Sequence, residues 1–402
     1  MKIRKKQYTA ENVLDAARNR IRHLYDSFDS VCVSFSGGKD STACLNLCAE
    51  IAKERGKLPV RAIFFDEEAI HPPTVEYVER VRQRPDVALE WYCLPVQHRN
   101  ACSNDEPFWT CWEETKRDIW VRPMPEVGIP AHPLFKPGMS FQEFCPLIVG
   151  RNGCIIQGIR TQESLRRYRV VTNKRNDNYV SRQRGTAAAF PIYDWSSDDV
   201  WRYVTESVCD YNRFYDILNK TRMHEDFLHQ RVCPPYGEEP LRGLWLYAEC
   251  FPEMWHKMIA RVAGAATASR YGNTELYSNT GKPDGMTWKA YSELQLSNLK
   301  TTSIFDDVNA GVRSLLSLHE KSSDDSIPDE QPHPLTGLSW KLIAKIVIKG
   351  DLKGRQAGYC KKIGFDWRAK NNMSLEHAIK HYGKHATHQR RPVDSPGQTK
   401  AQ

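Results

Sequence analysis

Short apolar runs alternate with helical patterns through the first half of the chain. The runs that we expect to form buried strands cover residues 31–35, 60–65, 87–94 and 154–159. Apolar residues at helical spacing predict helices over residues 11–28, 40–55 and 74–84. Strands that alternate with helices in this way predict a parallel sheet with right-handed crossover connections.

This rhythm is interrupted and then lost farther along the chain. Residues 95–150 are rich in Trp, Pro and Cys, and we interpret them as an insertion over the carboxyl-terminal edge of the sheet. The pattern predicts an α/β domain over residues 1–205 and a mainly helical region over 206–319. Residues 320–330 are typical of a linker, and residues 331–402 form a basic carboxyl-terminal segment. The expected fold class is α/β, with an open, mostly parallel sheet and helices on both faces.

The positive charge of the chain is unevenly placed. The formal net charge is +8. Residues 331–402 contain 14 Lys or Arg and 4 Asp or Glu, a balance of +10, so the remainder carries about −2. A solvated surface explains such a basic tail. Contact with nucleic acid explains it as well, because Lys341, Lys345, Lys349 and Lys353 recur at helical spacing.

Composition also limits where the protein acts. No apolar run approaches the roughly 20 residues that a membrane span needs. The amino-terminal residues are basic but lack the apolar stretch of a signal peptide. We therefore expect a cytoplasmic protein without membrane contact, in which the 12 cysteines stay reduced.

The most informative stretch follows the first predicted strand and reads Ser36-Gly37-Gly38-Lys39-Asp40-Ser41. Two glycines let the backbone approach an anion, and the free N–H groups at the start of the next helix point toward it. Lys39 adds a positive charge, and the serines add hydroxyl donors. The spacer of the Walker motif is missing, so the loop is a phosphate cradle of another kind.

This loop resembles the pyrophosphate loop (PP-loop) of the N-type ATP pyrophosphatases, the adenine nucleotide alpha hydrolase superfamily. Two later segments resemble motifs of its phosphoadenylyl-sulfate (PAPS) reductase branch, namely Gly158-Ile-Arg160-Thr-Gln-Glu163-Ser164 and Pro191-Ile-Tyr-Asp194-Trp195-Ser-Ser-Asp-Asp199-Val-Trp201. Further features, such as Trp91-Tyr-Cys-Leu-Pro95 and Ser339-Trp-Lys, resemble the DUF3440 group within that branch. In some genomes, members of this group are encoded beside a ParB-like protein.

The resemblance implies ATP binding and cleavage between the α and β phosphates, with transfer of the adenylyl group to an acceptor that the sequence does not identify. It implies catalytic roles for Lys39, Asp40 and Arg160, with Mg²⁺ bound alongside the nucleotide near Asp40. Phe65, Asp66 and Glu67 would border the adenosine, and Asp194 would orient Arg160 or an incoming ligand. The full set implied to bind nucleotide is Ser34, Ser36, Gly37, Gly38, Lys39, Asp40, Ser41, Phe65, Asp66, Glu67, Gly158, Arg160, Glu163 and Asp194.

Two other functions stay open. The first is a PAPS reductase that uses a cysteine thiol, but the Glu-Cys-Gly-x-His segment of those enzymes is missing, and Cys360 is the single cysteine of the tail. The second is a regulator that senses a nucleotide without cleaving it and acts with a ParB-like partner or nucleic acid through the tail. ATP and PAPS are not distinguished by the sequence, nor is the oligomeric state.

Cysteine spacing raises the question of a metal site. Cys93, Cys102 and Cys111 recur with eight residues between them, as do Cys145 and Cys154. Some relatives that act in DNA sulfur modification carry an iron–sulfur cluster, and zinc binds to Cys-rich insertions in this superfamily. No Cys-x-x-Cys pair is present, so we favour packing over an iron–sulfur or zinc site.

Overall fold

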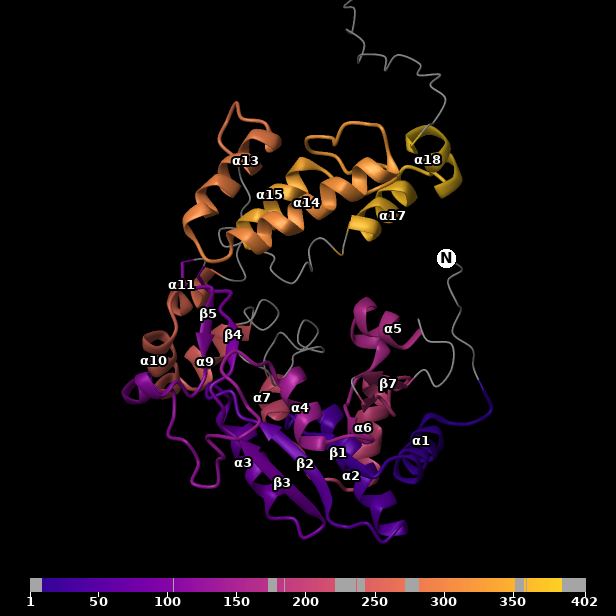
Figure 1. Cartoon of the computed structure of the whole chain (residues 1–402), viewed down its shortest axis with the longest axis vertical. Helices are drawn as coiled ribbons and strands as arrows, with labels where there is room; N and C mark the ends of the chain where they lie inside the picture. The colour runs from indigo at the N-terminus through magenta and orange to yellow at the C-terminus, as the bar shows by residue number, and fades with distance from the viewer. Residues whose placement is uncertain are drawn as a thin grey trace, which may run out of the picture. The chain divides into compact units, whose positions relative to one another are not determined.

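The computed structural model describes residues 9–103, 105–172, 179–183, 185–220, 236, 243–271, 282–350, 358 and 360–384. Contacts divide the chain into two units, Met1–Gly272 and Asn273–Gln402 (Figure 1). The division falls near residue 272, whereas the sequence pattern predicted boundaries at 205 and 319. Among the described residues, no helix is both long enough and apolar enough to cross a membrane.

The first unit is built around a six-stranded sheet with the order β3-β2-β1-β6-β8-β7. The neighbouring pairs are parallel except β7 and β8, which form an antiparallel hairpin. The strands are β1 (Ser30–Ser34), β2 (Val60–Phe65), β3 (Val87–Tyr92), β6 (Gly153–Ile156), β7 (Val180–Gln183) and β8 (Thr186–Ala189). The expected mostly parallel α/β fold is confirmed.

Helices cover both faces of this sheet. Consecutive residues of a strand point to opposite faces, and in the central strands both are buried. Cys32 and Val33 of β1 are both 0% exposed. The helices of the α/β part are α1 (Val13–Ser27), α2 (Lys39–Glu54), α3 (Pro72–Arg82), α4 (Phe141–Val149), α5 (Leu165–Thr172), α6 (Ser197–Glu206) and α7 (Phe214–Lys220). Helix α4 packs against β1 and β6, and α2 packs against β1, α1 and α6.

The expected insertion over residues 95–150 contains β4 (Gln97–Arg99), β5 (Phe108–Thr110), the 3₁₀ helix η1 (Glu114–Ile119) and α4. Strands β4 and β5 form a separate antiparallel pair. A second 3₁₀ helix, η2 (Thr161–Glu163), follows β6. The unit ends with α9 (Leu244–Cys250), α10 (Pro252–Arg261) and α11 (Ala265–Tyr271).

The order of the strands determines where a ligand binds. The chain runs outward from β1 to β2 and β3 and then returns to β6 on the other side of β1. Ligands of open α/β sheets bind beyond the carboxyl ends of the strands at such a switch point. The loop Ser36–Ser41 leaves β1 at this place.

The second unit is helical in its described part. It contains α13 (Trp288–Asn298), η4 (Leu299–Thr301), α14 (Phe305–Ser322), α15 (Trp340–Lys349), α17 (Cys360–Lys370) and α18 (Leu375–Tyr382). Its core joins α13 to α15 and α17, with Ile304, Ile343, Val347 and Cys360 among the buried members.

The segment that we predicted as a linker, 320–330, belongs to this packed structure. Helix α14 extends to Ser322, and the Ser323 side chain is buried. The Asp329 carboxylate accepts hydrogen bonds from the backbone N–H groups of Trp288 and Lys289, at 3.0 Å each. The backbone N–H of Trp340 donates to the Pro328 carbonyl at 3.0 Å. The low apolar content of this segment therefore reflects its role in capping helices.

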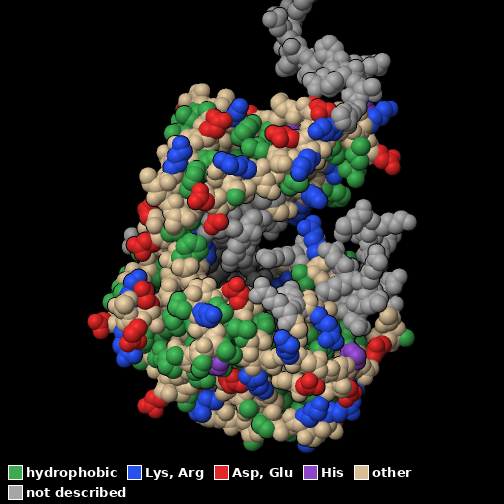
Figure 2. Space-filling model, viewed as in Figure 1, with side chains coloured by type: hydrophobic (Ala, Val, Ile, Leu, Met, Phe, Trp, Pro, Cys, Tyr) green, Lys and Arg blue, Asp and Glu red, His purple; other side chains and the backbone are tan. Residues whose placement is uncertain are grey.

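The basic face expected for residues 331–402 is mixed with acidic groups where the structure describes it. Lys341 pairs with Glu330 at 2.6 Å, whereas Lys361, Lys362 and Lys370 are exposed. On the face in Figure 2, acidic side chains lie between the Lys and Arg side chains of this unit. Lys353 and residues 385–402 lie outside the described residues. Nucleic-acid and ParB-like partners stay predictions.

Candidate functional site

The loop Ser36–Ser41 links the end of β1 to the start of α2. Gly37 has φ +71, a backbone conformation that side chains with a Cβ rarely adopt, and Gly38 is the N-cap of α2. The two serine hydroxyls lie 3.1 Å apart, and Ser41 Oγ donates to the Gly38 carbonyl at 2.9 Å. These contacts hold the loop in a tight turn.

This turn leaves backbone donors available to an anion. Within the described part of the chain, the N–H groups of Gly37, Asp40 and Ser41 have no hydrogen-bond acceptor. They stand at the N-terminal end of α2, where the helix dipole also favours negative charge. The loop therefore has the backbone geometry expected of a phosphate cradle, and its binding of phosphate stays a prediction.

Two cations converge on one carboxylate beside the loop. Lys39 Nζ lies 2.9 Å from Asp40 Oδ2, and Arg160 Nε lies 2.5 Å from Asp40 Oδ1. The Arg160 side chain is 2% exposed, and Glu163 approaches it at 3.4 Å. Burial lowers the pKa of Lys39, although the neighbouring Asp40 carboxylate opposes this shift. The structure thus brings Lys39, Asp40, Arg160 and Glu163 together, as the motifs implied.

Gly158 makes this convergence possible. A Cβ added at Gly158 would lie 2.6 Å from the Asp40 carbonyl carbon and 2.8 Å from the Ser41 nitrogen. The chain after β6 therefore touches the backbone of the loop directly. A side chain here would separate Arg160 from the carboxylate that it contacts.

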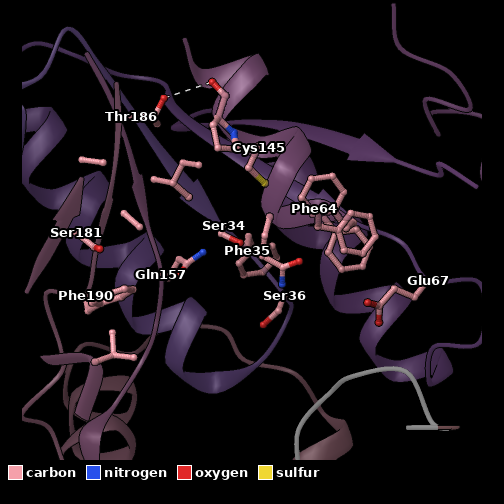
Figure 3. Close-up of a pocket in the computed structure, with 18 of the residues that line it drawn as sticks. Ser34, Phe35, Ser36, Phe64, Glu67, Cys145, Gln157, Ser181, Thr186 and Phe190 are labelled. Atoms are coloured by element: carbon pink, nitrogen blue, oxygen red, sulfur yellow. Dashed lines mark hydrogen bonds between the residues drawn. The ribbon is translucent and has the colours of Figure 1, made fainter. Parts of the chain in front are cut away.

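A pocket of about 460 Å³ opens beside the loop (Figure 3). One wall is aromatic, with Phe64 and Phe65 from β2 and Phe141 from α4. The rings of Phe65 and Phe141 stack with centroids 4.1 Å apart. Other lining residues include Ser34, Phe35, Ser36, Glu67, Cys145, Gln157, Ser181, Thr186 and Phe190. A flat aromatic wall beside a few polar groups fits a ring with hydrogen-bonding edges.

Two family models match the sequence. Residues 30–218 match the phosphoadenosine phosphosulfate reductase domain, and residues 223–309 match a domain of unknown function, DUF3440. Residues 30–218 therefore form a PAPS-reductase-like PP-loop domain. The "Uncharacterized protein YbdN" of Escherichia coli strain K12 is 29% identical over 398 residues, which cover 92% of this chain and 94% of that protein.

Solved structures similar to this PP-loop protein include several enzymes. The PAPS reductase of Candida auris, in a phosphate complex, has a TM-score of 0.28 and 13% identity and covers 53% of this chain and 93% of its own. The FMN adenylyltransferase of Candida glabrata, in complex with FAD and inorganic pyrophosphate, has a TM-score of 0.31 and 14% identity. The match covers 52% of this chain and 63% of that enzyme's chain. The U34-tRNA thiolase NcsA of Methanococcus maripaludis, with its [4Fe-4S] cluster, has a TM-score of 0.27 and 12% identity, with coverages of 66% and 81%.

Two of the three consecutive acidic residues after β2, Asp66 and Glu67, lie in different surroundings. Glu67 lines the pocket, and its place beside an adenosine stays a prediction. Asp66 does not, because its carboxylate is fully buried, accepts a hydrogen bond from Trp91 Nε1 at 2.7 Å and pairs with Arg122. The expectation that Asp66 borders a nucleotide is corrected: it anchors the insertion to the end of β2.

Asp194 also differs from its expected role. Its two carboxylate oxygens pair with the guanidinium of Arg20 in α1, at 2.8 and 2.7 Å. Arg160 is held by Asp40 and Glu163 instead. Asp194 therefore joins the segment before α6 to α1 and is not the partner of Arg160, whereas a contact with an incoming ligand stays a prediction.

Motif comparison missed two residues that contact the loop. Asn212 Nδ2 donates to the Gly37 carbonyl at 3.0 Å, and the Tyr215 hydroxyl accepts from the Lys39 backbone N–H at 3.0 Å. Both follow α6, more than 170 residues after the loop. A lone Asn and a lone Tyr at that distance give no sequence signal of this contact.

The cysteines of the described residues show no metal-site geometry. Among the described residues, no group of three or more His, Cys, Asp or Glu side chains is arranged to hold a metal ion. Cys93, Cys102, Cys111, Cys145 and Cys154 are each buried. Burial raises the pKa values of Cys102, Cys145 and Cys154 to about 12, so their thiols are protonated at neutral pH.

Proposed function

We propose that this PP-loop protein binds ATP and cleaves it between the α and β phosphates, transferring the adenylyl group to an acceptor. The observation that carries the proposal is the position of Ser36. Ser36 belongs to the phosphate loop and also lines the aromatic pocket, so the two sites are continuous. A pocket of about 460 Å³ lies within the range of small-molecule sites.

Each part of the site has a role in this reaction. The pocket, with Phe65 and Glu67 in its lining, receives the adenosine. The N–H groups of Gly37, Asp40 and Ser41 donate hydrogen bonds to oxygens of the β and γ phosphates. The acceptor attacks the α phosphorus, and the bond to the bridging oxygen breaks as pyrophosphate leaves with the electron pair.

Positively charged groups stabilise the departing pyrophosphate. Lys39 and Arg160 are both held by Asp40, so they are positioned before the ligand arrives. Mg²⁺ bound with the nucleotide would neutralise phosphate charge, and Asp40, whose two carboxylate oxygens pair with Lys39 and Arg160, would hold it through water. Positioning and charge carry the reaction, and no protein nucleophile is needed.

The thiol-dependent alternative is less well supported by the positions of the cysteines. Cys360 lies in the buried core of the second unit, among Leu338, Ile343 and Val347. Cys145 lines the pocket, but burial raises its pKa to about 12, so it is a thiol and not the thiolate that attacks sulfur.

The proposal is tested by titration calorimetry with ATP, PAPS and AMP, together with an assay of pyrophosphate release. We expect wild type to bind ATP and release pyrophosphate. Lys39→Ala should weaken ATP binding about tenfold or more, because hydrogen bonds to charged groups contribute about 1.5–3 kcal/mol. Lys53→Ala, an exposed lysine near the other end of α2, is the matched control and should behave as wild type.

Two results would contradict the proposal. If PAPS binds and ATP does not, adenylyl transfer from ATP is excluded. If neither nucleotide binds, the assignment of the pocket and the loop as a nucleotide site is wrong. Binding of ATP without pyrophosphate release would favour the nucleotide-sensing regulator.

A further inference from the structure

A short segment after α6 supports the phosphate loop from outside its motif. Asn212 is 1% exposed. Its Nδ2 donates to the Gly37 carbonyl at 3.0 Å and to Thr74 Oγ1 at 2.8 Å, and its Oδ1 accepts from the Phe214 N–H at 2.9 Å. Because a trans peptide directs its C=O and N–H oppositely, holding the Gly37 carbonyl directs the Gly38 N–H the other way, toward Ser36 Oγ at 3.4 Å. Asn212 thus fixes the orientation of one peptide of the cradle.

Tyr215 places a hydroxyl group at the same loop. Its oxygen accepts a hydrogen bond from the Lys39 backbone N–H at 3.0 Å and would lie 3.5 Å from a Cβ at Gly38. The side chain is 9% exposed, and its ring packs edge-on against Trp201 with centroids 5.1 Å apart. The hydrogen bond to Lys39 and the packing on Trp201 therefore fix the position of the hydroxyl at the N-terminal end of α2.

The hydrogen of this hydroxyl is left available. The Tyr215 oxygen acts as an acceptor toward Lys39, and among the described residues no group accepts the Tyr215 O–H in return. Burial raises the pKa of Tyr215, so the hydroxyl keeps its hydrogen at neutral pH. A buried donor with no acceptor, next to a loop built of donors, indicates a missing anionic acceptor.

We propose that Tyr215 is a phosphate-binding residue that donates its hydroxyl hydrogen to an oxygen of the leaving pyrophosphate, and that Asn212 is its positioning partner on the loop. This inference rests on the proposed function of the loop. The Lys39 N–H does not reach the ligand itself but polarises the tyrosine hydroxyl, which strengthens the hydrogen bond that the hydroxyl donates.

The test compares Tyr215→Phe with Tyr211→Phe by titration with inorganic pyrophosphate and, separately, with adenosine. Tyr211 is a matched control, because its ring also packs edge-on against Trp201 while its hydroxyl bonds to Asp216 at 2.9 Å. We expect Tyr215→Phe to bind pyrophosphate about tenfold more weakly, as for the loss of one hydrogen bond to a charged group. Adenosine binding should be unchanged, which also shows that the variant is folded. Tyr211→Phe should bind both as wild type does.

Three outcomes would overturn the inference. Unchanged pyrophosphate affinity in Tyr215→Phe would show that the hydroxyl does not reach the ligand. Tighter pyrophosphate binding would show that it blocks the Lys39 N–H. An equal loss for adenosine would show a general structural role. Failure of the proposed function is distinct from these, since wild type would then bind neither pyrophosphate nor ATP.

Discussion

At the residue scale, the site depends on the absence of one side chain. Gly158 brings the chain after β6 into contact with the backbone of Asp40 and Ser41. Two residues later, Arg160 reaches the Asp40 side chain at 2.5 Å. The spacing of the motif Gly158-Ile-Arg160 therefore has a structural reason. The glycine lets the chain after β6 approach the phosphate loop, and the arginine two residues later pairs with Asp40.

This contact predicts the effect of Gly158→Ala. The added Cβ would meet backbone atoms at 2.6 to 2.8 Å, which cannot move aside as a side-chain end can. We expect a loss of about 1–3 kcal/mol in the free energy of unfolding, as for other overpacked sites, and at least about tenfold weaker ATP binding. Urea denaturation and ATP titration measure the two effects.

Gly56→Ala is the control for this substitution. Gly56 has φ +64 but no atom within 4 Å of its added Cβ, so it tests backbone strain without a clash. We expect a cost of about 1 kcal/mol with unchanged ATP affinity. An unaltered ATP affinity in Gly158→Ala would show that the close approach is not needed by the site.

At the element scale, a helix of the DUF3440 match secures the wall of the pocket. Arg261 of α10 donates to both carboxylate oxygens of Glu68, at 2.9 and 3.1 Å. Glu68 has φ +64 and is 0% exposed, and it stands between the pocket-lining residues Glu67 and Ile70. It also accepts from the backbone N–H groups of Trp112 and Val121, at 2.7 and 3.0 Å. One carboxylate thus joins the end of β2, the insertion and α10.

Arg261→Met should destabilise the first unit strongly. The variant leaves a buried carboxylate with backbone donors alone, and breaking a buried pair in this way costs about 3–5 kcal/mol. The double variant Arg261→Met/Glu68→Gln should recover part of this loss, because it removes the unpaired charge and its amide oxygen still accepts from one of the two backbone N–H groups. Urea denaturation measures each free energy of unfolding.

Arg22→Met is the matched control, since the Arg22–Glu54 pair lies at 2.9 Å on the surface. We expect it to cost at most about 1 kcal/mol. Equal urea midpoints for Arg261→Met and Arg22→Met would contradict the anchoring role of Arg261.

Features that are contiguous in the sequence could be predicted, and those assembled from distant segments could not. The strand at β1, the glycine turn and the helix α2 follow one another, so their pattern alone indicates a phosphate loop. Whether Asp66 or Glu67 faces the pocket depends on Arg122 of the insertion, because Arg122 forms an ion pair with Asp66. The hairpin β7–β8 gives no strand signal in the sequence, because Val180–Gln183 is mostly polar and Thr186–Ala189 is rich in alanine, which is depleted in strands.

At the scale of the whole molecule, each unit buries an imidazole in its described part. In the first unit, His71 stacks between Phe214 and Tyr247, with ring centroids 3.7 and 4.2 Å away. In the second unit, His333 packs edge-on against His319 at 4.8 Å. Burial lowers the pKa of His71 to about 3, and burial with the neighbouring His319 lowers that of His333 to about 4.

These shifts predict acid sensitivity in both units. The folded pKa of each histidine lies below the unfolded value of about 6.5, so the unfolded chain binds the proton first as the pH falls. The stability that each neutral imidazole contributes is fully present above about pH 6.5. It is lost as the pH falls toward 4 for His333 and toward 3 for His71. Each histidine should lower the free energy of unfolding by about 1.4 kcal/mol per pH unit in this window.

His71→Phe separates this effect from the titration of carboxylates, because phenylalanine keeps the stacking between Phe214 and Tyr247. Between pH 7 and pH 5, wild type should lose about 2 kcal/mol more stability than His71→Phe, since about 1.5 pH units of that interval lie below the unfolded pKa. Urea denaturation followed by the fluorescence of the first unit's tryptophans, at both pH values, measures the difference. We expect the folded imidazole to stay neutral, because it packs between two aromatic rings and its Nε2 has no hydrogen-bond partner among the described residues. Equal losses of stability in the two proteins would contradict this, because they would show that His71 binds its proton equally well in the folded and unfolded states.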